Sequence, residues 1–350
     1  MYSVTNNRGF VPQTEQFEDR DMVGEDIKAY KVIHKDEFAY NPARINVGSI
    51  ARYEGDKPCM ISSLYVCFKS RGQIDSNWLM HLLKTPKMNF YYNLNGEGGV
   101  RVYLFYPNFA RIYTSYPGME EQKKIAKLLS LLDERIAIQN KVIDKLQSLI
   151  KGINQRVFMN NGINYKLGEV CEIRSGYSGN QLLSKKGLKV SRIETISGHK
   201  VNMERVGYVA PFESSENYRL RVGDILFSNI NSVEYIGNTA FIDKDYDLYH
   251  GMNLLRLTPN NTVVIPFYLY LLLNTNRMLN HFKTVCNKAV SQASINQTEL
   301  GKTVIQIPPI KTQERICELY QALYTKLETA SHTKSLFQNQ KQYMLRQMFI

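Results

Sequence analysis

The sequence contains few of the residues that build disulfide frameworks or metal sites. Its five cysteines, Cys59, Cys67, Cys171, Cys286 and Cys317, include no Cys-x-x-Cys pair, which argues against a zinc site and a disulfide framework. The six histidines lie far apart, without the spacing of metal ligands. We therefore expect reduced thiols, no metal and no cofactor.

Catalytic motifs are also missing. Gly96-Glu97-Gly98-Gly99 lacks the following Lys-Ser or Lys-Thr of a phosphate-binding loop. Asn41-Pro42-Ala43-Arg44 is close to the Asn-Pro-Pro-aromatic motif of amino-methyltransferases, but it lacks the second proline and the aromatic residue that would stack on a flipped base. No catalytic residue is predicted, so nuclease or methylation chemistry would have to come from partner chains.

No apolar run is long enough to cross a bilayer, and the N-terminus lacks the basic-then-apolar order of a signal peptide. We therefore expect a cytoplasmic protein without a membrane partner. The 44 Lys and Arg residues outnumber the 32 Asp and Glu residues, giving a formal charge of +12. This excess favours a polyanionic partner but does not say which one.

A proline followed by a glutamine and a long helix occurs twice. The copies are Pro117-Gly118-Met119-Glu120-Glu121-Gln122 and Pro308-Pro309-Ile310-Lys311-Thr312-Gln313, with the glutamines 191 residues apart (313 minus 122). Such a repeat in a chain of 350 residues predicts two similar globular parts, each followed by a helix.

The residues after each copy follow a coiled-coil heptad, because apolar side chains recur at alternating steps of four and three. The first stripe is Ile125, Leu129, Leu132, Ile136, Gln139, Ile143, Leu146, Ile150, Ile153 and Val157, and the second is Ile316, Tyr320, Leu323, Leu327, Ala330, Lys334, Phe337, Lys341, Met344 and Met348. A helix facing a globular core would carry a wider stripe. The pattern therefore favours a coiled coil, and two such helices lying antiparallel would form a rigid spacer.

Both globular parts are predicted to be α+β. In the second part, β-prone runs lie at 189–193, 224–227, 239–242 and 252–257, with a short helix at 266–274. In the first part, 35–41 aligns with 223–229 at an offset of 188 (224 minus 36), and 77–85 aligns with 267–275 at an offset of 190 (275 minus 85). Such drift is expected if loops changed length after a duplication.

With these tracts the chain resembles, over nearly its whole length, the DNA specificity (S) subunits of type I restriction-modification systems. The strongest marks are the junctions 111–122 and 304–316, and further ones are the runs 223–228 and 291–296. The resemblance implies an α+β fold with two similar target recognition domains, at 1–116 and 161–308, separated by two long antiparallel coiled-coil helices at 117–160 and 309–350. It also implies a bipartite double-stranded DNA target, two docked methyltransferase (modification) subunits, and restriction or translocase subunits in the same complex.

The first domain departs from this pattern at its start. The second domain has an opening segment, Tyr165 to Gly179, before its strand at 189–192. The first domain begins directly at Tyr2-Ser3-Val4-Thr5, the counterpart of that later strand. Two explanations stay open: the start of the protein lies upstream, or the chain is a shortened form, such as a product of recombination between specificity genes.

Candidate DNA contacts lie in loops rich in Arg, Asn, Gln, Ser and Lys, the side chains that read base edges and hold phosphates. In the second domain they are Arg174, Ser175, Tyr177, Asn180, Ser191, Arg192, Asn229, Asn231, Lys288, Ser291 and Gln292, and in the first they are Asn6, Arg44 and Arg101. For any single residue, a solvated turn without DNA contact is an equal alternative. The resemblance indicates the face and does not supply the bases.

Three classes of function account for these features to different extents. A non-catalytic DNA reader of a restriction-modification complex explains the duplication, the charge and the paired helices. A non-catalytic coiled-coil scaffold leaves two similar basic domains without a purpose, and an enzyme would need a motif that the sequence lacks. A truncated or single-half specificity protein of a related system is a variant of the first class.

Overall fold

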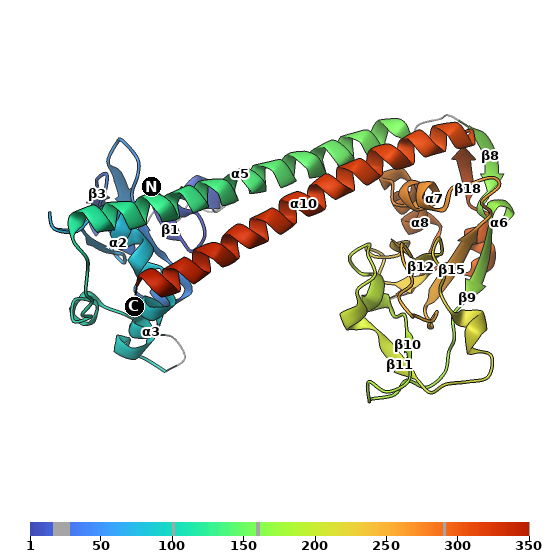
Figure 1. Cartoon of the computed structure of the whole chain (residues 1–350), viewed down its shortest axis with the longest axis horizontal. Coiled ribbons are helices and arrows are strands. Elements are labelled where there is room, and N and C mark those ends of the chain that lie inside the picture. The colour runs from blue at the N-terminus through green and yellow to red at the C-terminus, as the bar shows by residue number, and fades with distance from the viewer. Residues whose placement is uncertain (17–28, 100–101, 159–161, 290–291, 350) are drawn as a thin grey trace. The chain divides into compact units, whose positions relative to one another are not determined.

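The computed structural model describes residues 1–16, 29–99, 102–158, 162–289 and 292–349. The chain divides into two compact units (Figure 1), in which unit 1 is Met1–Val142 with Ala330–Ile350 and unit 2 is Ile143–Thr329. The boundary after Val142 falls inside the long helix α5 (Met119–Val157), and the boundary after Thr329 falls inside the long helix α10 (Ile310–Met348). Each long helix therefore contributes residues to both units.

Unit 1 combines two small sheets with short helices. Its elements are β1 (Tyr2–Thr5), β2 (Gly9–Pro12), α1 (Gln13–Gln16), β3 (Lys31–Ile33), β4 (Phe38–Tyr40), the 3-10 helix η2 (Ile45–Val47), β5 (Ile50–Arg52), β6 (Cys59–Ile61), β7 (Val66–Phe68), α2 (Ser76–Leu83), α3 (Pro86–Asn95) and α4 (Tyr106–Phe109). The strand orders are β2-β1-β6-β3 and β5-β4-β7.

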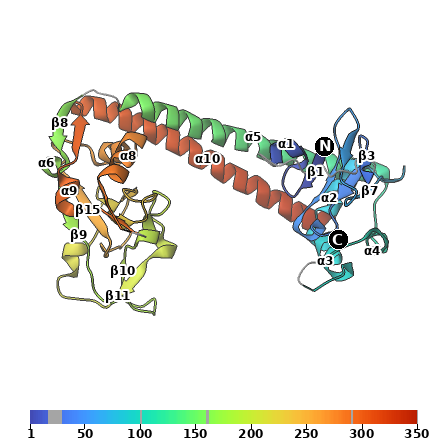
Figure 2. The same ribbon diagram turned by 180° about the vertical axis from the view of Figure 1, so that it is seen from behind.

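Unit 2 has more strands. Its elements are β8 (Ile163–Lys166), α6 (Leu167–Val170), β9 (Cys171–Ser175), β10 (Leu188–Val190), the 3-10 helices η3 (Ile193–Ile196) and η4 (Met203–Arg205), β11 (Gly207–Val209), the 3-10 helix η5 (Ser215–Tyr218), β12 (Ile225–Ser228), β13 (Ile230–Asn231), β14 (Thr239–Phe241), β15 (Leu254–Pro259), α7 (Pro266–Leu273), α8 (Asn276–Val285), β16 (Asn287–Lys288), β17 (Ala293–Ser294), α9 (Gln297–Gly301) and β18 (Val304–Ile307). The sheet β14-β12-β15-β9 is its centre, and α6 and α9 lie beside β9 (Figure 2). The predicted strands at 224–227, 239–242 and 252–257 and the predicted helix at 266–274 are confirmed, but the run 189–193 ends as a strand at Val190.

The two units repeat the same backbone pattern, at an offset that the structure corrects. Asp36 and Gly223 have positive φ angles of 67° and 99°, and each donates its N–H to the residue that directly follows a neighbouring strand, Tyr53 after β5 or Ile242 after β14. The offset is therefore 187 (223 minus 36), and the predicted 188 was wrong by one residue. A one-residue slip exchanges the two faces of a strand, whereas at 187 the core residues Tyr40 and Phe227 coincide.

The long helices pack antiparallel along the predicted stripe. Every predicted seam residue of both helices is buried or half-buried, which confirms the heptad. In unit 1 the ammonium of Lys341 donates to Asp133 Oδ1 at 2.5 Å, and in unit 2 the hydroxyl of Tyr320 donates to Asn154 Oδ1. The two pairs lie three heptads apart along both helices, from 133 to 154 and from 341 back to 320. Lys341, which interrupts the apolar pattern, is therefore neutralised across the seam.

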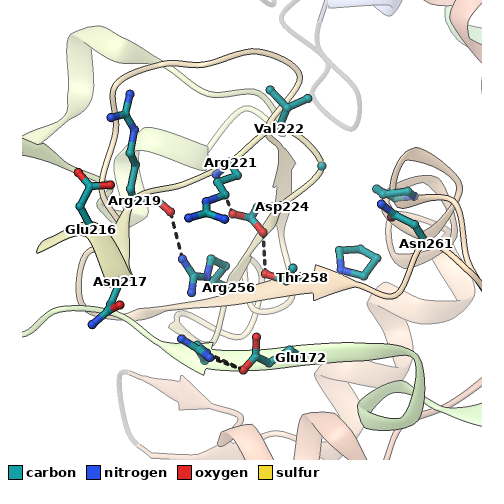
Figure 3. A pocket seen from close by; sticks show the side chains of 14 residues that line it. Glu172, Glu216, Asn217, Arg219, Arg221, Val222, Asp224, Arg256, Thr258 and Asn261 are labelled. Carbon is teal, nitrogen blue, oxygen red and sulfur yellow. Dashed lines mark hydrogen bonds and ion pairs between the residues drawn. The ribbon is translucent and has the colours of Figure 1, made fainter. Parts of the chain in front are cut away.

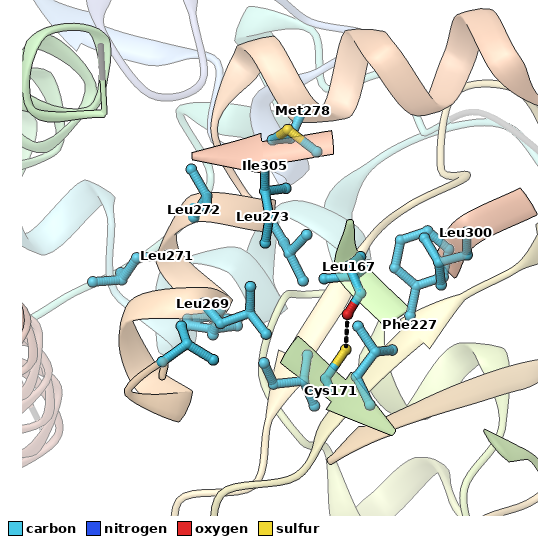
Figure 4. Packing of buried hydrophobic residues seen from close by; sticks show 14 of the residues in the cluster. Leu167, Cys171, Phe227, Leu269, Leu271, Leu272, Leu273, Met278, Leu300 and Ile305 are labelled. Carbon is cyan, nitrogen blue, oxygen red and sulfur yellow. Dashed lines mark hydrogen bonds between the residues drawn. The ribbon is translucent and has the colours of Figure 1, made fainter. Parts of the chain in front are cut away.

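Near each globular part the helices also complete a hydrophobic core. In unit 1, Leu129 and Phe349 are buried with Trp78, whose ring centroid lies 5.5 Å from that of Phe349. In unit 2, Ile316 and Tyr320 join a core that also contains Leu167, Phe227 and Ile305 and apolar residues of α7 and α8 (Figure 4). The buried stripe is wider at these ends than in the middle. The coiled-coil interpretation therefore holds for the middle of the helices, and the interpretation as core-facing helices holds near the globular parts.

The repeated glutamine is buried in both units and makes the same three hydrogen bonds. Gln122 accepts from Asp75 N at 2.8 Å and donates to Gln73 O at 3.1 Å and Pro117 O at 2.8 Å. Gln313 accepts from Ile265 N at 2.8 Å and donates to Val263 O at 3.1 Å and Pro308 O at 2.9 Å. In each unit this one side chain ties the start of the long helix to the start of a short helix, α2 or α7.

Two histidines, the half-buried His81 and the buried His250, make the stability of the chain sensitive to acid. Burial lowers the pKa of His81 and of His250 to about 4 from the ordinary 6.5. Between these values the unfolded chain binds a proton at each ring and the folded chain does not. Stability should therefore be complete above about pH 6.5 and fall as the pH drops towards 4, by up to about 1.4 kcal/mol per pH unit for each histidine.

Urea unfolding at pH 7 and pH 5 would measure this loss. Replacing the buried imidazole in His250→Gln should reduce the difference between the two pH values, even if the variant is less stable at both. An identical difference in the variant and the native chain would contradict the role of His250.

Candidate nucleic-acid interface

A three-stranded sheet brings two of the predicted loops of unit 2 together. Its order is β13-β17-β16, with Asn231 opposite Ala293 and Lys288 opposite Ala293 on the other side. Asn231 donates to Ser228 Oγ at 3.0 Å and accepts from Ser232 N at 2.8 Å, which fixes its amide. Asn229 is half-buried, Lys288 and Gln292 are exposed, and Ser291 lies outside the described residues.

A second group of candidate residues, Tyr177, Ser191 and Arg192, lies beside the segment 249–251. Tyr177 N donates to His250 O at 2.9 Å, and Ser191 N donates to Tyr249 O at 2.8 Å. Arg192, which follows directly, is exposed and lies 3.6 Å from the carboxylate of Glu194. This group therefore presents a cation that a phosphate or a guanine could compete for.

Ser191 does not belong to the candidate contacts. Its side chain is 1% exposed, and its hydroxyl accepts a hydrogen bond from Gly251 N at 3.0 Å. The sequence prediction selected it because serine is common in DNA-binding loops. The structure instead uses it to join two segments of the fold, so the prediction was wrong for this residue.

The ring of Tyr177 is already occupied on one face. It stacks on Phe212 with centroids 3.9 Å apart and an interplanar angle of 7°, and Tyr218 packs against it edge-on. An aromatic stack of this kind stabilises a loop by about 0.5–1.5 kcal/mol beyond the area that it buries. Tyr177 is therefore held by aromatic packing beside the segment that contains Arg192.

A cavity of about 130 Å³ joins the two groups. Its lining includes Glu194 and Ser197, which follow Arg192, Ser228, which precedes the three-stranded sheet, and Asn231, which belongs to that sheet. Asn231 and the residues that directly follow Arg192 therefore line one cavity of unit 2.

A cluster of four arginines lies around a larger cavity of about 350 Å³ in unit 2 (Figure 3). Arg174 pairs with Glu172 at 2.6 Å and Arg219 with Asp245 at 3.0 Å, and this carboxylate raises the pKa of Arg219. Arg256 is 8% exposed and donates only to Arg219 O among the described contacts. Unit 1 has Cys67 at the position of Arg256, so the cluster is particular to unit 2.

The sequence prediction found Arg174 and missed the other three arginines. Arg256 could have been found as the single cation in the apolar run Leu254-Leu255-Arg256-Leu257, because burying an unpaired charge in a strand is costly and indicates a specific role. The sequence prediction also did not include Lys185 and Lys186 among the candidate DNA contacts. They lie in the stretch 180–187, where every residue is exposed, including the predicted Asn180. Ser175 is exposed at the end of β9.

In unit 1 the predicted residues lie in two adjoining turns. Asn6 is exposed in the β1–β2 turn, and Gly48 of the next turn lies against its backbone. Asn6 and Asn46 line one cavity of about 400 Å³. Arg44 is exposed and its carbonyl accepts from Ser49 N at 3.0 Å. Arg101 lies outside the described residues.

Both units hold the central loop in the same way. Leu104 N donates to Pro42 O at 3.0 Å in unit 1, and Ile295 N donates to Asn229 O at 2.9 Å in unit 2. Arg44 and Asn231 therefore occupy equivalent positions, two residues after these carbonyls. One position in the same scaffold thus carries a guanidinium in one unit and an amide in the other, which are groups that prefer different bases.

The described part of the chain contains no group of three or more His, Cys, Asp or Glu residues placed to hold a metal ion. None of its helices combines the length and the apolar character that spanning a membrane requires.

Comparisons with known proteins point to one family. A family model for the type I restriction modification DNA specificity domain matches residues 32–148 and 162–336. A Methanocaldococcus jannaschii protein assigned as the MjaX type I restriction enzyme specificity subunit is 38% identical over 188 residues, covering 53% of this chain and 44% of that protein. The EcoKI specificity subunit of Escherichia coli is 25% identical over 250 residues, covering 63% of this chain and 53% of that protein. The chain thus spans about half the length of these relatives.

The fold is also shared with a solved structure. The crystal structure of a type I restriction-modification system S subunit from M. genitalium superposes with a TM-score of 0.61 at 14% identity, covering 91% of this chain and 83% of that chain. At this identity the likeness shows a common fold.

Proposed function

The chain belongs to the type I restriction modification DNA specificity family, and from this premise we propose that it is the non-catalytic DNA-binding subunit of a type I restriction-modification complex. Each unit would read one half of a bipartite double-stranded target. Two methyltransferase subunits would dock on the chain and supply the chemistry, and restriction subunits would join the same cytoplasmic complex.

The observation that carries the proposal is the duplicated loop scaffold. Pro42 and Asn229 accept equivalent backbone bonds, and different polar side chains follow them at matching positions. A protein that reads two different half-sites needs such a constant frame with variable contacts. The surface with Arg192, Asn231 and Lys288 would face the DNA in unit 2, and the turns with Asn6 and Arg44 would do so in unit 1.

The division of labour follows from the side chains. Arg192, Arg44 and Asn231 carry groups that can contact base edges, whereas Lys185, Lys186 and Lys288 are suited to phosphates and would provide salt-dependent affinity. The domain limits 1–116 and 161–308, with the helices between and after them, would then be the functional divisions of the chain.

The proposal is tested by mixing the chain with its methyltransferase and mapping methylated adenines on DNA. We expect methylation at one bipartite sequence, and only when this chain is present. Methylation that is independent of the chain, or that has no bipartite preference, would refute the proposal.

One substitution tests the assigned face. Arg192→Ala should weaken binding or relax a single position of one half-site, by about 1–3 kcal/mol if the arginine bonds a base. Lys326→Ala, which removes an exposed cation from α10, is the matched control and should leave the recognised sequence unchanged. The methylated motif and the affinity at two salt concentrations are the measurements. An unaltered motif and affinity for Arg192→Ala would remove this residue from the interface.

A second candidate function is favoured by the smaller sheet of unit 1. In the described residues that sheet has three strands, where the equivalent sheet of unit 2 has four. The chain would then be a single-half specificity protein in which unit 2 alone reads DNA. A methylated motif with only one specified half would distinguish this function from the first.

A further inference from the structure

Arg256 is a buried cation of unit 2 without an opposite charge. Its side chain is 8% exposed and belongs to β15, which lies between β12 and β9 in the central sheet. One guanidinium nitrogen donates to Arg219 O at 3.2 Å, while Nε has no hydrogen-bond partner among the described residues. In the same part of the chain, Arg174 and Arg219 have ion pairs and Arg256 has none. Burying an unpaired guanidinium is costly, so its presence indicates a specific role.

A second arginine lies directly opposite Arg256 in the neighbouring strand. The register of β15 and β9 pairs Arg256 with Arg174, and side chains paired in this way share one face of the sheet. Like charges at such positions destabilise a sheet. In unit 1 the counterpart of Arg256 is Cys67, because Cys67 pairs with Ala39 as Arg256 pairs with Leu226. The same scaffold is therefore built without an arginine here.

Arg221 brings a further guanidinium to this face from a tight turn. Asp224 N donates to Arg221 O at 3.0 Å, Arg221 N donates to the carboxylate of Asp224 at 2.8 Å, and Gly223 between them has a φ angle of 99°. The same carboxylate accepts from the hydroxyl of Thr258 in β15 at 2.6 Å. Asp224 thus fixes the turn against β15. The side chain of Arg221 is exposed and makes no ion pair within the described residues.

These side chains line the cavity of about 350 Å³ that Figure 3 shows. The charged groups of its lining are four arginines and three carboxylates, namely Arg174, Arg219, Arg221, Arg256, Glu172, Glu216 and Asp224. Each carboxylate already has a partner: Glu172 pairs with Arg174, Asp224 holds the turn, and Glu216 accepts from the hydroxyl of Tyr249 at 3.5 Å. The guanidiniums of Arg221 and Arg256 are therefore the groups that remain for a ligand.

The chemistry of the cavity suits a phosphate group. Guanidinium groups pair with the oxygens of carboxylates and phosphates through two parallel hydrogen bonds. Here the guanidiniums come from two strands and a turn, and a tetrahedral phosphate presents oxygens in several directions, whereas a carboxylate presents two in one plane. None of the described lining residues is aromatic, so the cavity provides no surface on which a base would stack.

We propose that Arg256 and Arg221 form a phosphate-binding site in unit 2, beside the paired Arg174. The phosphate oxygens would accept from the free Nε of Arg256 and from the guanidinium of Arg221, and their charge would offset the repulsion between Arg256 and Arg174. Two sources carry this chemistry. One is a free phosphate or small phosphate ester, and the other is a backbone phosphate of DNA, which rests on the proposed function.

Thermal unfolding of the full chain with inorganic phosphate tests the site. Compared with chloride of equal ionic strength, phosphate should raise the unfolding temperature by about 2–4 °C at about ten times its dissociation constant. Arg256→Met and Arg221→Gln should each reduce this shift to less than about half, as a lost charge-assisted bond predicts. Lys326→Ala, which removes an exposed cation from α10, should keep the full shift. Each variant is compared with itself in chloride, so its own stability does not affect the readout.

A short duplex of arbitrary sequence separates the two sources. If the ligand is a DNA phosphate, the duplex should remove the phosphate-induced shift, and Arg256→Met should lower the salt dependence of duplex binding by about one counterion. If the ligand is a free phosphate, the shift should persist with the duplex bound and the salt dependence should stay the same.

Three results would overturn the site: no shift beyond that of chloride, an equal shift with acetate, or a full shift in both arginine variants. The phosphate measurement requires no DNA and no methyltransferase, so this inference and the proposed function can fail separately.

Discussion

Gln313→Ala should remove on the order of 3–5 kcal/mol from the stability of unit 2, and Gln122→Ala should do the same in unit 1. Each substitution leaves one buried N–H and two carbonyls without partners, and each unpaired buried group costs about 1–3 kcal/mol. Gln313 and Gln122 are both 0% exposed, so water does not replace the lost bonds without opening the fold. Such a loss is large against the 5–15 kcal/mol that holds a typical domain together.

The measurement can separate the two units, because Trp78 is the single tryptophan and lies in the core of unit 1. In Gln122→Ala the unfolding transition followed by tryptophan fluorescence should move to a lower urea concentration. In Gln313→Ala the transition followed by far-ultraviolet circular dichroism should move to lower urea by more than the transition followed by fluorescence. Gln147→Ala in α5 and Gln321→Ala in α10 remove exposed glutamines and should change stability by less than about 0.5 kcal/mol. Shifts as small as those of the controls would show that the junction glutamine is dispensable.

Lengthening both long helices by one heptad should widen the unread gap of the DNA target by about three base pairs. Seven residues add about 10.5 Å of helix, and successive base pairs are about 3.4 Å apart. The structure requires the change in both helices. Repeating 139–145 in α5 and 329–335 in α10 keeps the Lys341–Asp133 and Tyr320–Asn154 pairs, whereas one insertion alone breaks one of them.

The methylated motif of the double insertion, mapped by sequencing, is the readout. Both half-sites should stay as they are while the gap grows. The single insertion in α5 is the matched control and should lose activity or stability because the seam falls out of register. An unchanged gap in an active double insertion would refute the proposal that helix length measures the distance between half-sites.

Periodic features of this chain were predictable from the sequence, because they depend on local spacing. The heptad stripe and the junction glutamines follow from residues a few positions apart, and the seam burial confirms them. The α+β class followed from short strands between turns. The alignment of 35–41 with 223–229 was one residue out because it matched Asp36 with Asp224, whereas the shared feature is a left-handed backbone at Asp36 and Gly223.

Features that depend on burial were not predictable. Ser191 lies in a loop-like polar run, and only the packing of 249–251 against it removes it from the surface. Arg219, Arg221 and Arg256 come from different segments and meet only in the folded unit. For the contact residues the sequence supplied the chemical types, while their accessibility was decided by contacts between segments that are distant in the chain.

The division of the long helices between the units has a consequence for how the protein is made. The core of unit 1 includes Leu345 and Phe349, which leave the ribosome only after all of unit 2 has been synthesised. The half of the protein that is translated first is therefore the last to be completed. Until then Trp78 and its neighbours lack the cover that Leu345 and Phe349 provide.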